Sequence, residues 1–208
     1  MKWSDAVTAM TDKIIKRVRG KGRGWVFTPK DFLDLGTRAS VDMALTRLLN
    51  SGSIRRIGRG LYDYPMVHDK LGLLSPDADM IVQALAIQSG YKVVESGAMA
   101  ANRLGISTQV PAKLSYATSG ASRSKKVAGQ AITLKRSRAP ILDDASLQAN
   151  AVLQVLAHLG KANVDDRAIQ ILASRLNGPD LWALKTARSQ MTGWMSDTVS
   201  KIELAKQG

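Results

Sequence analysis

"SIRRIGRGLYDYP", residues 53–65, decides how the first third of this chain folds. Two stretches with apolar residues, SIRRI and LYDY, flank the sequence Gly58-Arg59-Gly60. Short strand-like stretches separated by glycines are typical of a β-hairpin. The same stretch places Arg55, Arg56 and Arg59 close together. We therefore predict a short hairpin that carries concentrated positive charge.

The residues before this hairpin predict three helices and a short strand. Apolar residues at spacings of three and four predict an amphipathic helix over residues 4–19, which ends at Gly20. A basic loop and a short extended piece lead to Thr28, the expected N-cap of a second helix that begins with proline. A third helix over residues 38–50 carries an apolar stripe and ends near Gly52. Helix, strand, helix, helix and hairpin is the order of a winged helix-turn-helix, in which the hairpin is the wing.

The pattern changes near residue 75. Residues 66–76 are bounded by prolines and are expected to link two domains. The sequence predicts an α+β protein, with an N-terminal winged helix-turn-helix domain (1–66) followed by a mixed α/β domain with C-terminal helices (75–208). Within the second domain we expect helices at 75–90, 97–107, 143–160, 163–176 and 180–205, strands at 91–96, 112–118 and 131–137, and a basic loop at 119–130.

Positive charge is unevenly distributed along the chain. The formal net charge is +13, of which the first 60 residues contribute +8, the next 80 contribute +5 and the remainder contributes none. A basic region of this kind favours a polyanionic partner. We therefore expect double-stranded DNA to bind in the first two thirds of the chain, and the last third to serve packing or protein contacts.

Composition excludes several classes of site. The chain has no cysteine and only two histidines, His68 and His158, so a zinc finger, a thiolate nucleophile and a disulfide framework all lack their parts. We expect no cofactor and no metal, and we expect His158 to be a partly buried structural residue. Trp182 and Trp194 are expected to fill a core. No apolar run is long enough to span a bilayer and no signal-peptide core is present, so we expect no membrane partner and a cytoplasmic protein.

The predicted helix-turn-helix gives a set of candidate DNA contacts. The exposed face of the third helix enters the major groove in such domains, and its first residues reach base edges. Arg38 is expected to contact a guanine, and Thr46 or Arg47 a phosphate. The full face comprises Arg38, Ser40, Asp42, Met43, Thr46 and Arg47. Backbone or minor-groove contacts are expected from Lys21, Arg23, Arg55, Arg56 and Arg59. The alternative for each charge is ordinary solvation.

A second basic cluster lies in the expected loop at 119–130. Arg123, Lys125 and Lys126 belong to it, and Lys135, Arg136 and Arg138 follow. This possible second nucleic-acid patch has an alternative as a solvated hairpin tip. It also supports a different class of function, an RNA-binding module, although the chain has few aromatic residues on which bases would stack.

Three stretches of the sequence resemble one known family. They are "ALTRLLNSGSIRRIGRGLYDYP" (44–65), "RLGISTQVP" (103–111) and "YATSG" (116–120). Together they resemble AbiEi-type antitoxins of type IV toxin–antitoxin (abortive infection) systems, over roughly residues 1–140. The resemblance implies an N-terminal domain that represses its own operon by binding operator DNA. It also implies a second domain that counteracts a nucleotidyltransferase-like toxin, without requiring direct contact between the two proteins.

Enzyme functions fit the sequence poorly. Asp77 and Glu95 resemble the first carboxylates of a metal-dependent nuclease, but Gly97 stands where its lysine is required. Asp77 is better explained as an acid in the first turn of a helix, with Ser75 as the cap. A nucleotidyltransferase needs paired acids after Gly-Ser, whereas "SGASRSKK" offers basic residues. We therefore expect no enzymatic activity.

Overall fold

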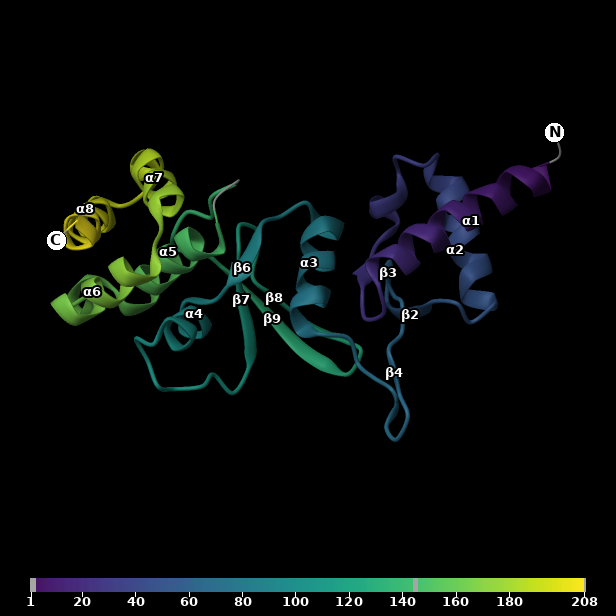
Figure 1. Ribbon diagram of the computed structural model, residues 1–208, viewed down its shortest axis with the longest axis horizontal. Helices are drawn as coiled ribbons and strands as arrows, with labels where there is room; N and C mark the ends of the chain where they lie inside the picture. The colour runs from purple at the N-terminus through teal and green to yellow at the C-terminus, as the bar shows by residue number, and fades with distance from the viewer. Residues whose placement is uncertain (1–2, 144–145, 208) are drawn as a thin grey trace. The chain divides into compact units, whose positions relative to one another are not determined.

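The chain folds into two units, and the computed structural model describes residues 3–143 and 146–207 (Figure 1). Unit 1 extends to Gly90 and includes residues 125–131, and unit 2 comprises the rest. The expected α+β class is confirmed. The division differs from the boundary predicted at 66–75, because helix α3 (Ala78–Ser89) packs on strand β1 (Val26–Phe27) within unit 1.

Two α-helices of unit 1 build its core. Helix α1 (Trp3–Lys21) packs against α2 (Arg38–Asn50), and Ile14, Val18 and Leu45 are completely buried between elements of this unit. The predicted helices are confirmed, although α1 continues past Gly20. It ends one residue later because Gly22 has a positive φ of 89°, which a continuing helix does not allow.

The segment between these helices contains the predicted cap but a shorter helix. Thr28 is the N-cap as expected: its Oγ1 accepts from Lys30 N at 3.2 Å, and Asp31 Oδ2 accepts from Thr28 N at 2.8 Å. The helix is the single 3-10 turn η1 (Pro29–Phe32). After the turn, Leu35 N donates to Phe32 O at 2.9 Å. This hydrogen bond spans three residues, as in a 3-10 helix, and not the four of an α-helix.

A three-stranded antiparallel sheet completes this part of unit 1. Strands β2 (Arg55–Gly58) and β3 (Leu61–Asp63) form the predicted hairpin, and β1 pairs with the other side of β3. Gly60 in the turn has a φ of 66°, and a Cβ added there would lie 2.8 Å from Gln88 Nε2. The positive φ therefore favours glycine at this position. The predicted order of elements is confirmed over residues 3–63, with the 3-10 turn η1 in the place of the second helix.

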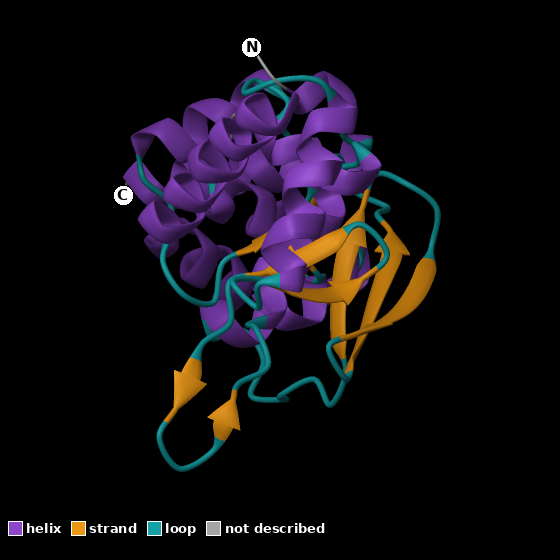
Figure 2. Ribbon diagram, turned by 90° about the vertical axis from the view of Figure 1, so that its right-hand side faces the viewer, coloured by secondary structure: helices purple, strands orange, loops and turns teal. Residues whose placement is uncertain are grey.

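Residues 66–76, the expected linker, contain a second small hairpin. Strands β4 (Val67–His68) and β5 (Gly72–Leu73) pair with each other and are visible as a separate orange pair in Figure 2. Leu74 N donates to Met66 O at 2.9 Å and closes the hairpin at its base. The following helix α3 is capped by Asp77, whose Oδ1 accepts from Asp79 N, and not by Ser75 as predicted.

A four-stranded sheet lies mainly in unit 2, while its residues 125–131 belong to unit 1. Its order is β6-β7-β9-β8, in which β6 (Val93–Glu95) is antiparallel to β7 (Leu114–Thr118), and β7 is parallel to β9 (Gln130–Arg136). The three predicted strands are confirmed. The predicted basic loop instead contains strand β8 (Arg123–Val127), which pairs with β9 through a turn at Ala128 and Gly129.

The α-helices of unit 2 share one core (Figure 1). Its helices are α4 (Gly97–Leu104), α5 (Leu147–Leu159), α6 (Asp166–Arg175), α7 (Gly178–Thr186) and α8 (Gly193–Gln207), with short 3-10 turns at Lys161–Asn163 and Arg188–Gln190. The helical segment predicted at 180–205 therefore consists of two helices, α7 and α8. The predicted helix at 143–160 includes residues 144 and 145, which lie outside the described residues. Trp194 packs on the core as expected, but Trp182 is 69% exposed.

The helices of the described chain, 3–143 and 146–207, include no segment that is both long and apolar enough to cross a bilayer.

Candidate nucleic-acid interface

A groove of about 510 Å³ on unit 1 is lined by polar and charged side chains from four parts of the sequence. Helix α2, the β2–β3 hairpin, α3 and the turn region of β8 all contribute to its walls. The lining residues are Arg38, Asp42, Thr46, Arg56, Arg59, Gly60, Tyr62, Gln88 and Lys125. We call this surface the α2–hairpin groove. Its described lining holds the cationic side chains of three arginines and a lysine, together with one carboxylate.

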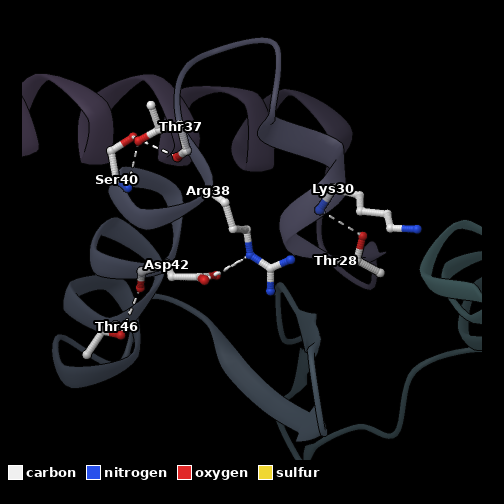
Figure 3. Close-up of polar contacts among 7 residues, drawn as sticks. All are labelled: Thr28, Lys30, Thr37, Arg38, Ser40, Asp42 and Thr46. Carbon is white, nitrogen blue, oxygen red and sulfur yellow. Dashed lines mark hydrogen bonds and ion pairs between the residues drawn. The ribbon is translucent and has the colours of Figure 1, made fainter.

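Helix α2 contributes three residues at spacings of four, which lie on one helix face. Arg38 Nε donates to Oδ1 and Oδ2 of Asp42 at 2.9 and 2.8 Å (Figure 3). Both side chains are about half exposed. Thr46 Oγ1 donates to Asp42 O at 2.8 Å, one turn earlier in the helix. The predicted recognition face is therefore accessible along this row.

The other predicted α2 contacts lie elsewhere on the helix. Ser40 belongs to the N-terminal cap: its Oγ donates to Thr37 O at 2.8 Å, and its backbone N donates to Thr37 Oγ1 at 3.3 Å (Figure 3). Met43 and Arg47 are exposed and line a neighbouring depression with Asp42 and Thr46. Ser40 therefore stabilises the helix terminus, while Arg47 lies beside the α2–hairpin groove.

The hairpin supplies two exposed arginines to the groove. Arg56 and Arg59 both line it, and Arg56 Nε donates to Gly58 O at 3.3 Å. Gln88 of α3 donates from Nε2 to Arg59 O at 2.8 Å and so fixes the turn that presents Arg59. Two of the three predicted hairpin arginines thus lie on the same surface as α2.

The third hairpin arginine, Arg55, has a different environment. Its Nε and Nη2 donate to the carboxylate of Asp63 at 3.0 and 2.5 Å, and Nη2 also donates to Leu74 O at 2.9 Å. Asp63 is 1% exposed. The hydrogen bonds that Arg55 donates to the Asp63 carboxylate raise the pKa of Arg55. Arg55 lies outside the groove lining and connects the hairpin to the following segment, and its role as a DNA contact stays a prediction.

Lys21 and Arg23 also lie outside the α2–hairpin groove. They line a separate cavity of about 480 Å³ in unit 1, together with Trp25 and Asp63. Arg23 Nη1 donates to Pro65 O at 2.8 Å, and its guanidinium carbon lies 4.9 Å from the centroid of the Tyr64 ring. The structure therefore separates these two predicted contacts from those of α2.

The residues of the predicted second nucleic-acid patch, Arg123, Lys125 and Lys126, do not all lie on one surface. Successive side chains of β8 point to opposite faces, and Lys125 lines the α2–hairpin groove while Lys126 is exposed but does not line it. Arg123 is only partly exposed. Lys135, Arg136 and Arg138 are exposed beyond it. Lys125 belongs to unit 1, so the structure joins one residue of the second predicted patch to the first.

Two residues of the α2–hairpin groove, Tyr62 and Gln88, were not among the predicted contacts. Tyr62 lies between the buried Leu61 and Asp63 on β3, and its ring stacks on Phe27 with centroids 6.0 Å apart. Strand alternation around Tyr62 was a signal that would have placed it on this face. No local signal pointed to Gln88, because its position depends on how α3 packs.

The residues considered for a nuclease have other roles. Asp77 caps α3, and Glu95 accepts from Arg103 Nε at 2.9 and 3.1 Å. Over residues 3–143 and 146–207 we find no group of three or more His, Cys, Asp or Glu side chains that is placed to hold a metal ion. His158, expected to be partly buried, is exposed in the last turn of α5. These residues therefore give no support to a catalytic centre.

Comparison with known proteins identifies the family but no activity. Residues 13–179 match the family described as "Family of unknown function (DUF6088)", and this stretch covers most of unit 1 and continues in unit 2 to the start of α7. A search of the curated proteins gave no match. Because the match covers well over half of the chain, this protein belongs to the DUF6088 family.

Proposed function

We propose that the chain is a sequence-specific DNA-binding transcriptional repressor and that unit 1 acts as a winged helix-turn-helix domain. The observation that supports this most strongly is the α2–hairpin groove, where the exposed row of α2 meets Arg56, Arg59 and Lys125. In this proposal α2 enters the major groove of DNA, and the β2–β3 hairpin follows the phosphate backbone.

The width of helix α2 and the positive charge around it support this arrangement. An α-helix with its side chains is about 10 to 12 Å across, which fits the major groove of about 12 Å. Arg38 is the first residue of α2, and the N-terminal residues of a recognition helix are those that reach base edges. Arg56, Arg59 and Lys125 offer positive charge to phosphates, which supplies affinity without reading sequence.

We propose further that the repressor acts on its own operon and counteracts a nucleotidyltransferase-like toxin, as in AbiEi-type antitoxins. The support for this second step is the sequence resemblance at 44–65, 103–111 and 116–120. If the neighbouring gene encodes such an enzyme, its expression alone is expected to arrest growth, and co-expression of this chain is expected to restore it. Continued arrest under co-expression would remove the antitoxin function and leave the repressor function standing.

A reporter assay tests the repressor function. The DNA upstream of the protein's own gene is fused to a reporter, and the full chain is supplied in trans. Wild type is expected to lower expression, while Arg38→Ala and the double variant Arg56→Ala/Arg59→Ala are expected to relieve repression. The matched control is Arg167→Ala/Arg175→Ala, which removes the same charge from exposed positions on α6 of unit 2.

The alternative function, an RNA-binding module, predicts a different result. In that case the wild type leaves the reporter unchanged and binds structured or single-stranded RNA more tightly than any DNA duplex of equal length. The exposed Lys126, Lys135 and Arg136 on β8 and β9 are the residues whose alanine variants would then lower affinity.

A further inference from the structure

Asp42 is an unusual residue on a surface that is proposed to face DNA. It is the single carboxylate in the described lining of the α2–hairpin groove, where the other charged groups are cationic. A carboxylate near phosphates weakens binding by repulsion, and an exposed i,i+4 ion pair adds little to helix stability. A role in reading bases would explain an acid at this place.

Asp42 first orients the guanidinium of Arg38. Arg38 donates to both carboxylate oxygens through Nε alone, and the two terminal nitrogens of the guanidinium point away from Asp42 (Figure 3). Those two nitrogens present parallel N–H groups of the kind that bind O6 and N7 of guanine as a bidentate pair. Asp42 therefore holds the guanidinium with its base-reading edge outward.

The carboxylate of Asp42 also has acceptor capacity beyond Arg38. Its two oxygens offer about four lone-pair sites, and the side chain is 47% exposed. In the major groove the amino group of cytosine N4 is the donor that an aspartate accepts, and it lies next to O6 of the paired guanine. Because Asp42 lies on the Nε side of the guanidinium, the cytosine within its reach belongs to the base pair next to the one that Arg38 contacts.

We propose that Asp42 determines specificity: it orients Arg38 for guanine and accepts a hydrogen bond from cytosine N4 of the neighbouring base pair. This inference rests on the proposed DNA-binding function and names the base pairs that the site recognises.

Selection from a pool of randomised DNA duplexes tests the inference. The full-length wild type, Asp42→Asn and Asp42→Ala are each used to select duplexes, which are sequenced and whose affinities are then measured. Asp12→Asn is the matched control, because it removes one exposed carboxylate from α1. Thermal unfolding of each variant shows whether the fold is retained.

The expected result has three parts. The wild-type motif contains a G·C pair whose replacement by A·T weakens binding about five- to hundredfold. Asp42→Ala reduces this discrimination, and Asp42→Asn shifts the preference toward adenine, which asparagine binds through N6 and N7. Asp12→Asn selects the wild-type motif.

Two other results would overturn the inference. One leaves the proposed DNA-binding function intact, and the other contradicts that function as well. If the wild type selects a motif and folded Asp42 variants select the same motif with unchanged discrimination, Asp42 is only a helix ion-pair partner and the DNA-binding function stands. If the wild type itself selects no motif and binds all duplexes equally, the proposed function fails together with the inference.

Discussion

The guanidinium of Arg55 holds the buried carboxylate of Asp63 across the β2–β3 hairpin, with Nη2 at 2.5 Å from Oδ2. The two residues are directly opposite in the strand register. The same guanidinium reaches Leu74 O, at the end of the β4–β5 hairpin. A residue that resembles its basic neighbours in the sequence is therefore part of the internal framework of unit 1, while Arg56 and Arg59 face solvent.

Removing Arg55 is expected to destabilise the protein. In Arg55→Ala the carboxylate of Asp63 stays buried without its partner, and loss of one member of a buried pair costs about 3 kcal/mol. Urea denaturation measures this as a lower free energy of unfolding. The control Arg56→Ala, at an exposed position, is expected to change stability by no more than about 0.5 kcal/mol. Equal stability of the two variants would contradict this role for Arg55.

The exposed hairpin arginines are expected to act through phosphates. Arg56→Ala/Arg59→Ala should weaken binding to all DNA duplexes and reduce the slope of log K against log salt concentration by about 1.8. Fluorescence anisotropy between about 50 and 200 mM salt gives this slope. The Arg167→Ala/Arg175→Ala control keeps the wild-type slope. An equal salt slope in the hairpin variant and in the wild type would show that Arg56 and Arg59 do not contact phosphates.

Neighbouring lysines on β8 offer an internal comparison. Lys125 lines the α2–hairpin groove and Lys126 does not, although both are exposed and carry the same charge. Lys125→Ala is therefore expected to lower DNA affinity and to reduce the salt slope by about 0.9, while Lys126→Ala leaves both near the wild-type values. Equal losses from the two substitutions would mean that the effect comes from net charge and not from position.

Acid sensitivity is expected at the contact between α1 and the segment after η1. Arg17 Nη1 and Nη2 donate to the Asp34 carboxylate at 2.7 and 2.6 Å, and these hydrogen bonds lower the pKa of Asp34. Because the folded-state pKa is depressed, the stabilisation is present above the unfolded value near 4 and is lost as the pH falls through the folded value. Asp34→Asn should thus unfold more easily than wild type at pH 7 and converge with it in strong acid, as measured by denaturation at each pH. A constant difference at all pH values would contradict this.

Local sequence patterns predicted the helices and strands of unit 1, whereas the contacts between them depend on tertiary packing. The hairpin, α2 and the Thr28 cap follow from glycine placement, helical periodicity and side-chain capping, all of which act over a few residues. The roles of Arg55 and Arg56 depend on strand register. A regular register from Gly58 opposite Leu61 would place Arg56 opposite Asp63, but the irregularity between Arg56 and Gly58 places Arg55 there instead. Lys125 and Gln88 were not readable, because no local pattern reports which distant segments pack beside the hairpin.

The most direct test of the central claim is the ratio of two affinities. Fluorescence anisotropy compares the DNA upstream of the protein's own gene with a scrambled duplex of equal length, at low salt and near physiological salt. Sequence-specific binding through the α2–hairpin groove predicts a preference of about a thousandfold or more near physiological salt, and a much smaller preference in Arg38→Ala. Equal affinity for both duplexes that collapses as salt rises would contradict the claim and reduce the groove to a nonspecific phosphate contact.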